Sequence, residues 1–280
     1  MIATTDFFGT KITRLILGDN PFGGHSYIPE HPADEMMDYY TADKCVRALF
    51  TAEESGINTC MPLADPFILR VLRQYRNEGG KMNIIFQSFP AMAIEATLQK
   101  MIACNPIGIY HQGGMTDLLC EEDRVEDLVK NIELLRATHV PIGIGTHDPV
   151  NLLRAESENW GADFYTVSLY NFRRTQIDRQ NSSATKEPGE VGFIPEDPPI
   201  MYKAIRTVKK QCIAIKIFAG GNIFCGKEPD EITKITESVF TDIYRNIKPC
   251  DVACMGAFQK FSDQIGHNAA IAERILTITQ

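Results

Sequence analysis

The chain has 280 residues, of which 44% are hydrophobic and 23% are charged, and its formal net charge is −8. That length suits one large α/β unit, and α/β barrels commonly use it as a single domain. An acidic chain lacks the basic face that a general binder of phosphate backbones carries. We therefore expect a small-molecule substrate and no nucleic-acid partner.

The cysteines and the N-terminus bear on the compartment. None of the eight cysteines forms a C-x-x-C pair, which favours free thiols in a reducing environment. The first residues are too polar for a signal peptide, and no apolar run reaches membrane-spanning length. The sequence predicts a cytoplasmic protein without a membrane segment, and it leaves the oligomeric state open.

Strand-like and helix-like segments alternate along the chain. A short hairpin is expected at Phe7–Ile12, around Gly9-Thr10. Strands are then expected at Arg14–Gly18, Asn58–Met61, Asn83–Ser88, Ile107–Tyr110, Pro141–Gly145, Phe164–Leu169, Ile213–Phe218 and Val252–Gly256. Helices are expected at Asp43–Ser55, Asp65–Asn77, Met92–Cys104, Glu121–Thr138, Pro149–Asn159, Pro198–Lys210, Pro229–Asn246 and Ser262–Thr277.

Strict alternation of eight strands with helices predicts a (β/α)₈ TIM barrel, formed as a single domain over residues 1–280, with the hairpin closing its bottom. A doubly wound open sheet is the alternative, and it would usually carry a glycine fingerprint after its first strand. Two connections are unusually long, at residues 20–40 and 172–197. Both would lie at the C-terminal mouth, where barrel enzymes place their active sites, and loops of this length are either functional or disordered.

Two expected strands end on a histidine, at His111 and His147. Their equivalent places suggest one shared site, and histidine serves both as an acid/base group and as a metal ligand. His147 shares its parity with Gly143 and Gly145, so we expect it to face inward, where two glycines leave room. The direction of His111 stays open, and a hydrogen-bonded structural histidine is the alternative for each.

A carboxylate ends the first strand, at Asp19, and His25 follows two glycines in the next loop. Asp19, His111 and His147 could together bind a divalent metal such as zinc or manganese, with water in the open position. Asp19 could instead cap its own turn. His25 is a candidate substrate contact, with a flexible loop histidine as the alternative.

A lysine interrupts the seventh strand, at Lys216. It shares its parity with Ala214 and Phe218, and we expect all three to face the barrel interior. An interior lysine needs a carboxylate, a lowered pKa or a covalent partner. Lys216 is therefore either a Schiff-base or proton-transfer lysine, or one that is ion-paired near the rim.

Other polar or flexible residues follow the third, sixth and seventh strands. Gln87 and Asn171 could hydrogen-bond substrate hydroxyls, although Asn171 could equally form a turn. Gly220 and Gly221 could present backbone N–H groups to an anion, with a tight turn as the alternative.

Segments spread over nearly the whole chain resemble the aldo-keto reductase superfamily. They are Lys11–Gly24, Gly56–Asn58, Ile109–His111, Gly145–Pro149, Ser168–Phe172, Met255–Ala257 and Gln264–Asn268. The resemblance implies a (β/α)₈ barrel with a nicotinamide cofactor across its mouth and a tetrad of Asp, Tyr, Lys and His. In that family the last helix meets the cofactor's adenosine end, so the resemblance makes Gln264 and Asn268 cofactor contacts, with Gly220 and Gly221 beside them.

Carried over residue by residue, the resemblance retains only His111 of the tetrad. Met61, Pro66 and Gln87 stand near the positions of the aspartate, tyrosine and lysine. Neither Met nor Pro can donate a proton to a carbonyl oxygen. The pair that holds the nicotinamide amide is replaced by Thr146-His147, and the basic phosphate-binding signature is reduced to Lys260.

The leading hypothesis is therefore an enzyme with a remodelled site, acting on a sugar-like or hydroxy-carbonyl metabolite. Its chemistry would be histidine- or metal-assisted proton transfer, hydrolysis or a lyase reaction, with catalytic residues Asp19, His111, His147 and Lys216. One alternative is an NAD(P)H-dependent carbonyl oxidoreductase with a non-standard proton donor. The other is a non-catalytic barrel that binds a metabolite.

Overall fold

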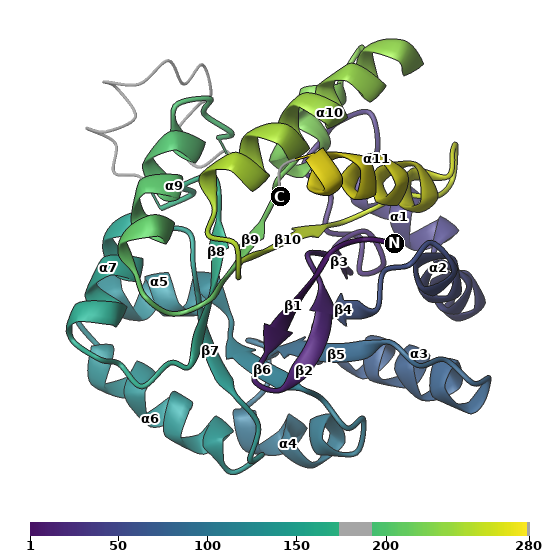
Figure 1. Cartoon of the computed structure of the whole chain (residues 1–280). Helices are drawn as coiled ribbons and strands as arrows, with labels where there is room; N and C mark the ends of the chain where they lie inside the picture. Colours follow the sequence, from purple (N-terminus) through teal and green to yellow (C-terminus); the bar gives the residue numbers. More distant parts are fainter. Residues whose placement is uncertain (174–191, 279–280) are drawn as a thin grey trace.

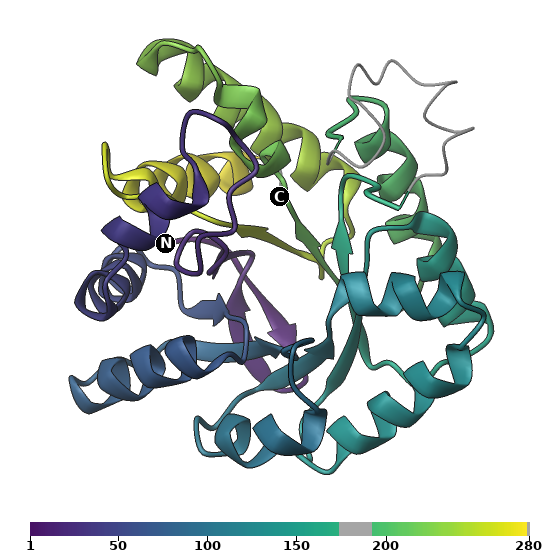
Figure 2. The ribbon, with the colours of Figure 1, turned by 180° about the vertical axis from the view of Figure 1, so that it is seen from behind.

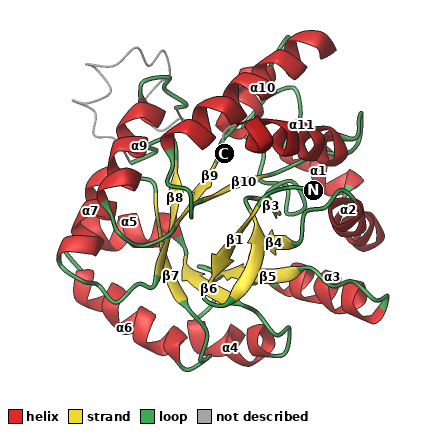
Figure 3. Ribbon diagram, in the orientation of Figure 1, coloured by secondary structure: helices red, strands yellow, loops and turns green. Residues whose placement is uncertain are grey.

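Eight parallel strands close into a barrel surrounded by helices (Figure 1, Figure 3). The computed structural model describes residues 1–173 and 192–278. The barrel strands are β3 (Leu15–Gly18), β4 (Thr59–Met61), β5 (Asn83–Gln87), β6 (Gly108–His111), β7 (Ile142–Thr146), β8 (Phe164–Ser168), β9 (Cys212–Ile215) and β10 (Val252–Met255). Because β10 pairs with both β9 and β3, no edge is left open. The predicted barrel is confirmed, and the open sheet is excluded.

The helices pack around the strands, as the ring of red ribbons in Figure 3 shows. They are α1 (Ala33–Tyr39), α2 (Ala42–Glu54), α3 (Pro66–Asn77), α4 (Ile94–Ile102), α5 (Gly113–Glu121), α6 (Val125–Arg136), α7 (Pro149–Ser157), α9 (Asp197–Thr207), α10 (Pro229–Asn246) and α11 (Gln264–Ile278), with a 3₁₀ segment η1 (Ala219–Phe224). None of the described helices is long and apolar enough to cross a bilayer.

The N-terminal hairpin closes one end of the barrel. β1 (Thr4–Phe7) and β2 (Thr10–Thr13) are antiparallel and are joined by a turn in which Gly9 has a φ of +88°. Phe7 and Ile12 join the residues of the barrel interior, and the Phe7 ring meets that of Phe164 edge-on at 5.0 Å. This burial removes apolar side chains from water at roughly 2 kcal/mol each, so the expected hairpin is confirmed at the barrel bottom.

Two apolar layers reveal which way each strand residue points. The interior layer includes Ile85, Tyr110, Ile213 and Ile215, whereas Ala214 belongs to the layer between strands and helices. The expectation that Ala214 faces the interior is therefore wrong. The preference of branched side chains for a tapering barrel interior explains the reversal.

The helix expected over residues 121–138 is present as α6, Val125–Arg136, and a separate helix that was not expected, α5, precedes it. α5 already begins at Gly113 and α6 begins at Val125, and Asp123 between them has a left-handed φ of +55°. Another helix, α1, lies inside the connection of residues 20–40. The start of α3 follows its signal, because the Asp65 carboxylate accepts a hydrogen bond from the Ile68 amide at 2.8 Å.

Candidate functional site

A pocket of about 960 Å³ opens at the carboxyl ends of the barrel strands. Each of the eight strands contributes to it, through Gly18, Met61, Gln87, Tyr110, Gly145, Thr166, Ile215 and Cys254. Its size lies at the upper end of the range for small-molecule sites. Figure 2 shows this end of the barrel, with the purple segment that follows β3 lying over it.

His147 lies at the pocket wall, one residue beyond the end of β7, and is paired with a buried acid. Its Nδ1 is 2.8 Å from Asp117 Oδ2, and its backbone amide donates to the same oxygen at 2.9 Å. Asp117 Oδ1 accepts from Thr146 Oγ1 at 2.5 Å and from Asn151 Nδ2 at 3.0 Å. The carboxylate is fully buried and saturated with donors, so it holds His147 in one orientation.

Helix α5 reaches β7 because Gly145 has no side chain. A Cβ on Gly145 would lie 2.8 Å from the Gly113 amide nitrogen and 2.9 Å from the His111 carbonyl oxygen. The Phe164 ring would in turn lie 2.6 Å from a Cβ on Gly143. The two glycines thus make room for protein atoms, and one of them lets α5 bring Asp117 beneath His147.

Hydrogen bonds keep Asp117 ionised. Burial alone would raise the pKa of its carboxyl, but the hydrogen bonds and charge attraction from His147, with the bond from Thr146, hold that pKa below its ordinary value. An ionised Asp117 fixes the proton of His147 on Nδ1 and leaves the lone pair on Nε2. Nε2 has no hydrogen-bond partner among the described residues, and the ring stacks on Phe172 with centroids 5.2 Å apart. This arrangement leaves Nε2 at the pocket wall, where it could accept a proton from a bound molecule.

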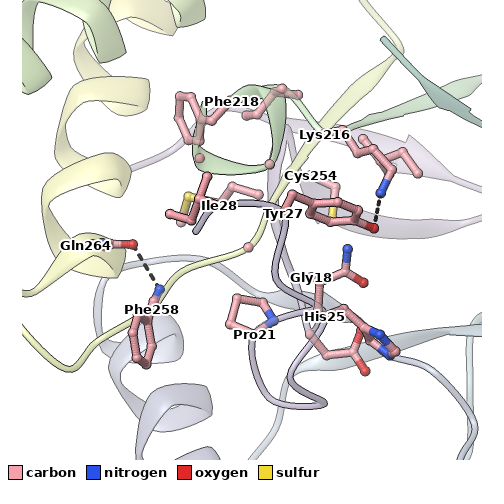
Figure 4. A pocket seen from close by; sticks show the side chains of 18 of the residues that line it. Gly18, Pro21, His25, Tyr27, Ile28, Lys216, Phe218, Cys254, Phe258 and Gln264 are labelled. Atoms are coloured by element: carbon pink, nitrogen blue, oxygen red, sulfur yellow. Dashed lines mark hydrogen bonds between the residues drawn. The ribbon is translucent and has the colours of Figure 1, made fainter. Parts of the chain in front are cut away.

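Lys216 enters the same pocket from the first residue after β9. Its Nζ donates to the Tyr27 hydroxyl at 2.5 Å and lies 4.1 Å from the centre of the Tyr27 ring. Figure 4 shows Tyr27 with its hydroxyl directed at this nitrogen. The Nζ also lies 4.9 Å from the centre of the Phe172 ring, the ring on which His147 stacks. His147, Lys216 and Tyr27 therefore gather around Phe172.

The pocket floor carries further polar groups. Asp19 accepts from the Leu63 amide at 2.8 Å, and its burial, reinforced by nearby Asp65, raises the pKa of its carboxyl to about 7. Tyr110 donates to Gln87 Oε1 at 2.5 Å. Thr166 Oγ1 is buried without a hydrogen-bond partner in the described part of the chain. A substrate here would meet a neutral or half-ionised acid and several hydroxyls.

His111 lies on the opposite face of its strand, outside the pocket. Tyr110 takes the interior position, so His111 points toward the helices, where its Nδ1 is 2.8 Å from Thr116 Oγ1 and its Nε2 is 3.2 Å from Asn131 Nδ2. Burial lowers its pKa to about 4. Its neutral ring is fixed by two hydrogen bonds, which is a structural arrangement, and its prediction as a catalytic residue in a site shared with His147 is corrected.

The predicted metal site is not assembled. His111 is separated from Asp19 and His147 by its own strand, and no group of three His, Cys, Asp or Glu side chains among residues 1–173 and 192–278 could hold a metal ion. The expected ligand set failed because side chains alternate along a strand, so equivalent positions at two strand ends need not share a face.

Other candidates have varied surroundings. His25 is exposed at the edge of the pocket. Asn171 does not line the pocket, and its Oδ1 caps the Arg173 amide at 2.9 Å, which is the turn-forming alternative. Gly220 and Gly221 line the pocket with φ of +59° and +98°. A Cβ on Gly220 would lie 2.7 Å from the Tyr27 ring, so this glycine admits the β3 loop. Most of the connection 172–197 lies outside the described residues.

The nicotinamide cofactor implied by the resemblance does not fit the start of α11. Asp263 Oδ1 caps the Gly266 amide at 2.9 Å, placing a carboxylate where a phosphate would use helix N–H groups. The Lys260 ammonium is bonded to Glu35 at 2.6 Å. Gln264 Oε1 accepts from the Phe258 amide at 2.9 Å (Figure 4), and Asn268 is buried at the pocket wall. The Asp263 carboxylate would repel a phosphate here, and Lys260 and Gln264 are already engaged by other protein groups.

Three residues of this site were missed in the sequence, namely Asp117, Tyr27 and Tyr110. Tyr110 could have been found from the alternation of interior residues on β6. Asp117 had no such signal, because its pairing depends on where α5 begins. Tyr27 belongs to a long loop, and the only cue was the position of that loop after a strand.

Comparisons with known proteins show the fold. No protein-family model matches the chain, and no curated protein matches its sequence. Three similar solved structures are the aldo-keto reductase AKR11C1 from Bacillus halodurans in its holo form (TM-score 0.57, 11% identity, covering 100% of this chain and 96% of that one), the glycerol dehydrogenase AKR11B4 from Gluconobacter oxydans (0.51, 11%, 98% and 95%) and the Yersinia pestis dihydropteroate synthase (0.54, 6%, 98% and 98%). At these identities the likeness is one of fold, and it includes aldo-keto reductases among other TIM-barrel proteins.

Proposed function

We propose that this protein is an enzyme that transfers a proton at the carbon next to a carbonyl group in a small hydroxy-carbonyl metabolite. The observation that carries the proposal is the hydrogen bond between buried Asp117 and His147, with Nε2 of His147 left open at the pocket wall. An isomerisation or an aldol addition would both begin with this step. The sugar-like substrate fits a mouth rich in hydroxyl and amide groups.

His147 acts as the base. Its Nε2 removes a proton from carbon, and the positive imidazolium that forms lies against the Asp117 carboxylate. Because Asp117 is fully buried, little water screens this attraction. The stacked Phe172 ring restricts the imidazole to one plane, which keeps Nε2 aimed at the substrate.

Lys216 and Tyr27 form the electron-accepting side. When the C–H bond breaks, its electron pair moves toward the carbonyl oxygen, where charge develops. Lys216 Nζ and the Tyr27 hydroxyl, 2.5 Å apart, supply donors for that charge. Both lie near the Phe172 ring on which His147 stacks, with the Lys216 Nζ 4.9 Å and the Tyr27 ring centre 6.1 Å from its centre.

A remote relationship to the aldo-keto reductase superfamily is part of the proposal. The matching sequence segments and two reductase structures among the neighbours support it. Asp263 at the start of α11 and the Lys260–Glu35 pair argue that the nicotinamide chemistry has been lost. The chemistry proposed here uses groups of this chain alone.

The test is carbon–hydrogen exchange in D₂O. The protein is incubated with dihydroxyacetone, glyceraldehyde, erythrulose and pyruvate, and deuterium at carbon is followed by NMR. We expect exchange with at least one compound, and His147→Gln should lower its rate by about 10²- to 10⁴-fold, the usual contribution of a general base.

A matched control is His139→Asn. His139 is an exposed histidine with a left-handed φ of +59°, which asparagine also tolerates. This variant should exchange at the wild-type rate. Absence of exchange with all four compounds, or exchange that survives His147→Gln unchanged, would overturn the proposed function.

A further inference from the structure

We propose that Lys216 is a nucleophile that forms an imine with the carbonyl carbon of the substrate. This inference rests on the proposed function and adds a covalent step to it. It assigns the substrate to aldehydes and ketones, and it makes the protonated imine, rather than the carbonyl oxygen, the electron acceptor.

The backbone at Lys216 has a left-handed conformation that turns the side chain into the pocket. Ile213 and Ile215 face the barrel interior, so alternation would direct the next side chain toward the helices. Lys216 instead has a φ of +58°. Residues with side chains pay of the order of 1 kcal/mol or more for this conformation, and such strain gathers at functional sites.

No other described non-glycine residue with a positive φ lines the pocket. The others are Phe8, Asn105, Asp123, His139, Asn159 and Ala219. Four of these are Asn, Asp or His residues, which tolerate the conformation better than lysine does. The left-handed lysine is therefore a local exception, and its effect is to aim an amine at the mouth.

The surroundings of Lys216 differ from those of the structural lysines. Lys210 and Lys248 are also partly buried, and each has a carboxylate within reach, Glu156 at 3.2 Å and Asp251 at 3.3 Å. No carboxylate of the described residues lies within hydrogen-bonding reach of the Lys216 Nζ. In place of an ion pair, Lys216 has the Tyr27 hydroxyl and two aromatic rings.

A hydroxyl is a partner for both forms of an amine. The Tyr27 oxygen accepts a hydrogen bond from an ammonium, and its O–H can donate to a neutral amine. A carboxylate would favour the charged form alone and so hold the proton on lysine. The space for Tyr27 is kept by Gly220, where a Cβ would lie 2.7 Å from the ring. The Tyr27 hydroxyl can therefore stay hydrogen-bonded to Lys216 whether the amine is charged or neutral.

The atoms and protons of the covalent step balance with the groups that this pocket supplies. The neutral amine attacks the carbonyl carbon, the C–N bond forms, and the π electrons of the carbonyl pass to its oxygen. Two protons of the original ammonium reach that oxygen through Tyr27: the one lost when the neutral amine forms, and one released from nitrogen after the attack. The oxygen then leaves as water, so an ammonium and a carbonyl become a protonated imine and one water. The imine then draws the electron pair of the neighbouring C–H bond as His147 takes the proton. Water reverses the linkage after the reaction.

The test traps the imine. Full-length protein is incubated with dihydroxyacetone, glyceraldehyde or pyruvate in the presence of sodium cyanoborohydride, which reduces a protonated imine to a stable secondary amine. Peptide mass spectrometry then locates the adduct. We expect modification at Lys216 well above that at exposed lysines, loss of it in Lys216→Arg, and slower trapping in Tyr27→Phe. Lys203→Arg, at an exposed lysine of α9, should leave the Lys216 adduct unchanged.

Two results separate this inference from the proposed function. Deuterium exchange that continues in Lys216→Arg at the wild-type rate, or trapping at Lys216 no greater than at exposed lysines, would overturn the imine and leave His147 as the base. An adduct at Lys216 in a protein that exchanges no carbon-bound hydrogen would support the imine and overturn the proton transfer.

Discussion

Strands β6 and β7 end in the same kind of sequence, yet His111 faces the helices and His147 faces the pocket. His111 is the last residue of β6 and pairs in register with Ile144, and both face the helices. His147 lies three residues beyond Ile144, past the end of β7 at Thr146. A histidine within a strand obeys its alternation, whereas one beyond the strand can turn toward the mouth. A shift of three positions along the register therefore separates a structural histidine from a candidate catalyst.

The largest effect on the difference between the two histidines is expected from Asp117→Asn. An amide cannot hold the His147 proton on Nδ1 with the same charge, nor balance the imidazolium. We expect the deuterium exchange rate to fall by about 10²- to 10⁴-fold, with the protein still folded. The measurement is exchange by NMR beside circular dichroism. An Asp117→Asn variant that exchanges at the wild-type rate would show that the pair has no catalytic role.

The pH dependence of stability should report the burial of His111. Burial favours the neutral ring of His111 and lowers its pKa from 6.5 to about 4, whereas the unfolded chain keeps the ordinary value. The contribution of His111 to stability is therefore complete above pH 6.5 and is lost as the pH falls toward 4, because the unfolded state takes up the proton first. The difference corresponds to about 3 kcal/mol.

Urea unfolding of wild type and His111→Gln between about pH 7 and pH 4.5 measures this effect. The variant should be less stable at neutral pH and should lose less stability on acidification than wild type does. Lys203→Arg, at an exposed lysine of α9, is the control and should retain the wild-type loss. Equal acid sensitivity of wild type and His111→Gln would show that His111 is not held neutral by its surroundings.

A smaller effect is expected from Lys216→Gly. Glycine adopts a positive φ without strain, so the free energy of unfolding should stay equal or rise by about 1 kcal/mol, while imine trapping is lost. Ala219→Gly is the control, because Ala219 also has a positive φ of +50° but does not line the pocket. That variant should gain similar stability and keep its activity. A marked loss of stability in Lys216→Gly would show that Lys216 is needed for the fold.

The barrel could be predicted because it depends on patterns repeated along the whole chain. Eight apolar runs and the helices between them all predict the same architecture. An error of a few residues in the bounds of any one strand or helix does not alter that prediction. Turns could also be predicted, because they depend on neighbouring residues alone. Examples are the Asp65 cap of α3 and the hairpin around Gly9.

The site was harder to predict because it depends on single residues. The inward-facing residues of β9 were predicted on the wrong face of the strand. Ile213 and Ile215 suit the barrel interior as well as they suit the helix-facing layer, and they lie in the interior. Lys216 reached the pocket through a left-handed backbone that no periodicity reveals. Asp117 is brought to His147 by helix α5, which begins at Gly113-Gly114. In the sequence a glycine pair predicts a turn and not the start of a helix.

The central claim is that His147 and not His111 carries the chemistry, and deuterium exchange in the two glutamine variants tests it most directly. The account predicts that His147→Gln loses exchange by about 10²-fold or more, while His111→Gln, measured per folded molecule at neutral pH, exchanges close to the wild-type rate. Exchange that persists in His147→Gln and is lost in folded His111→Gln would contradict the account.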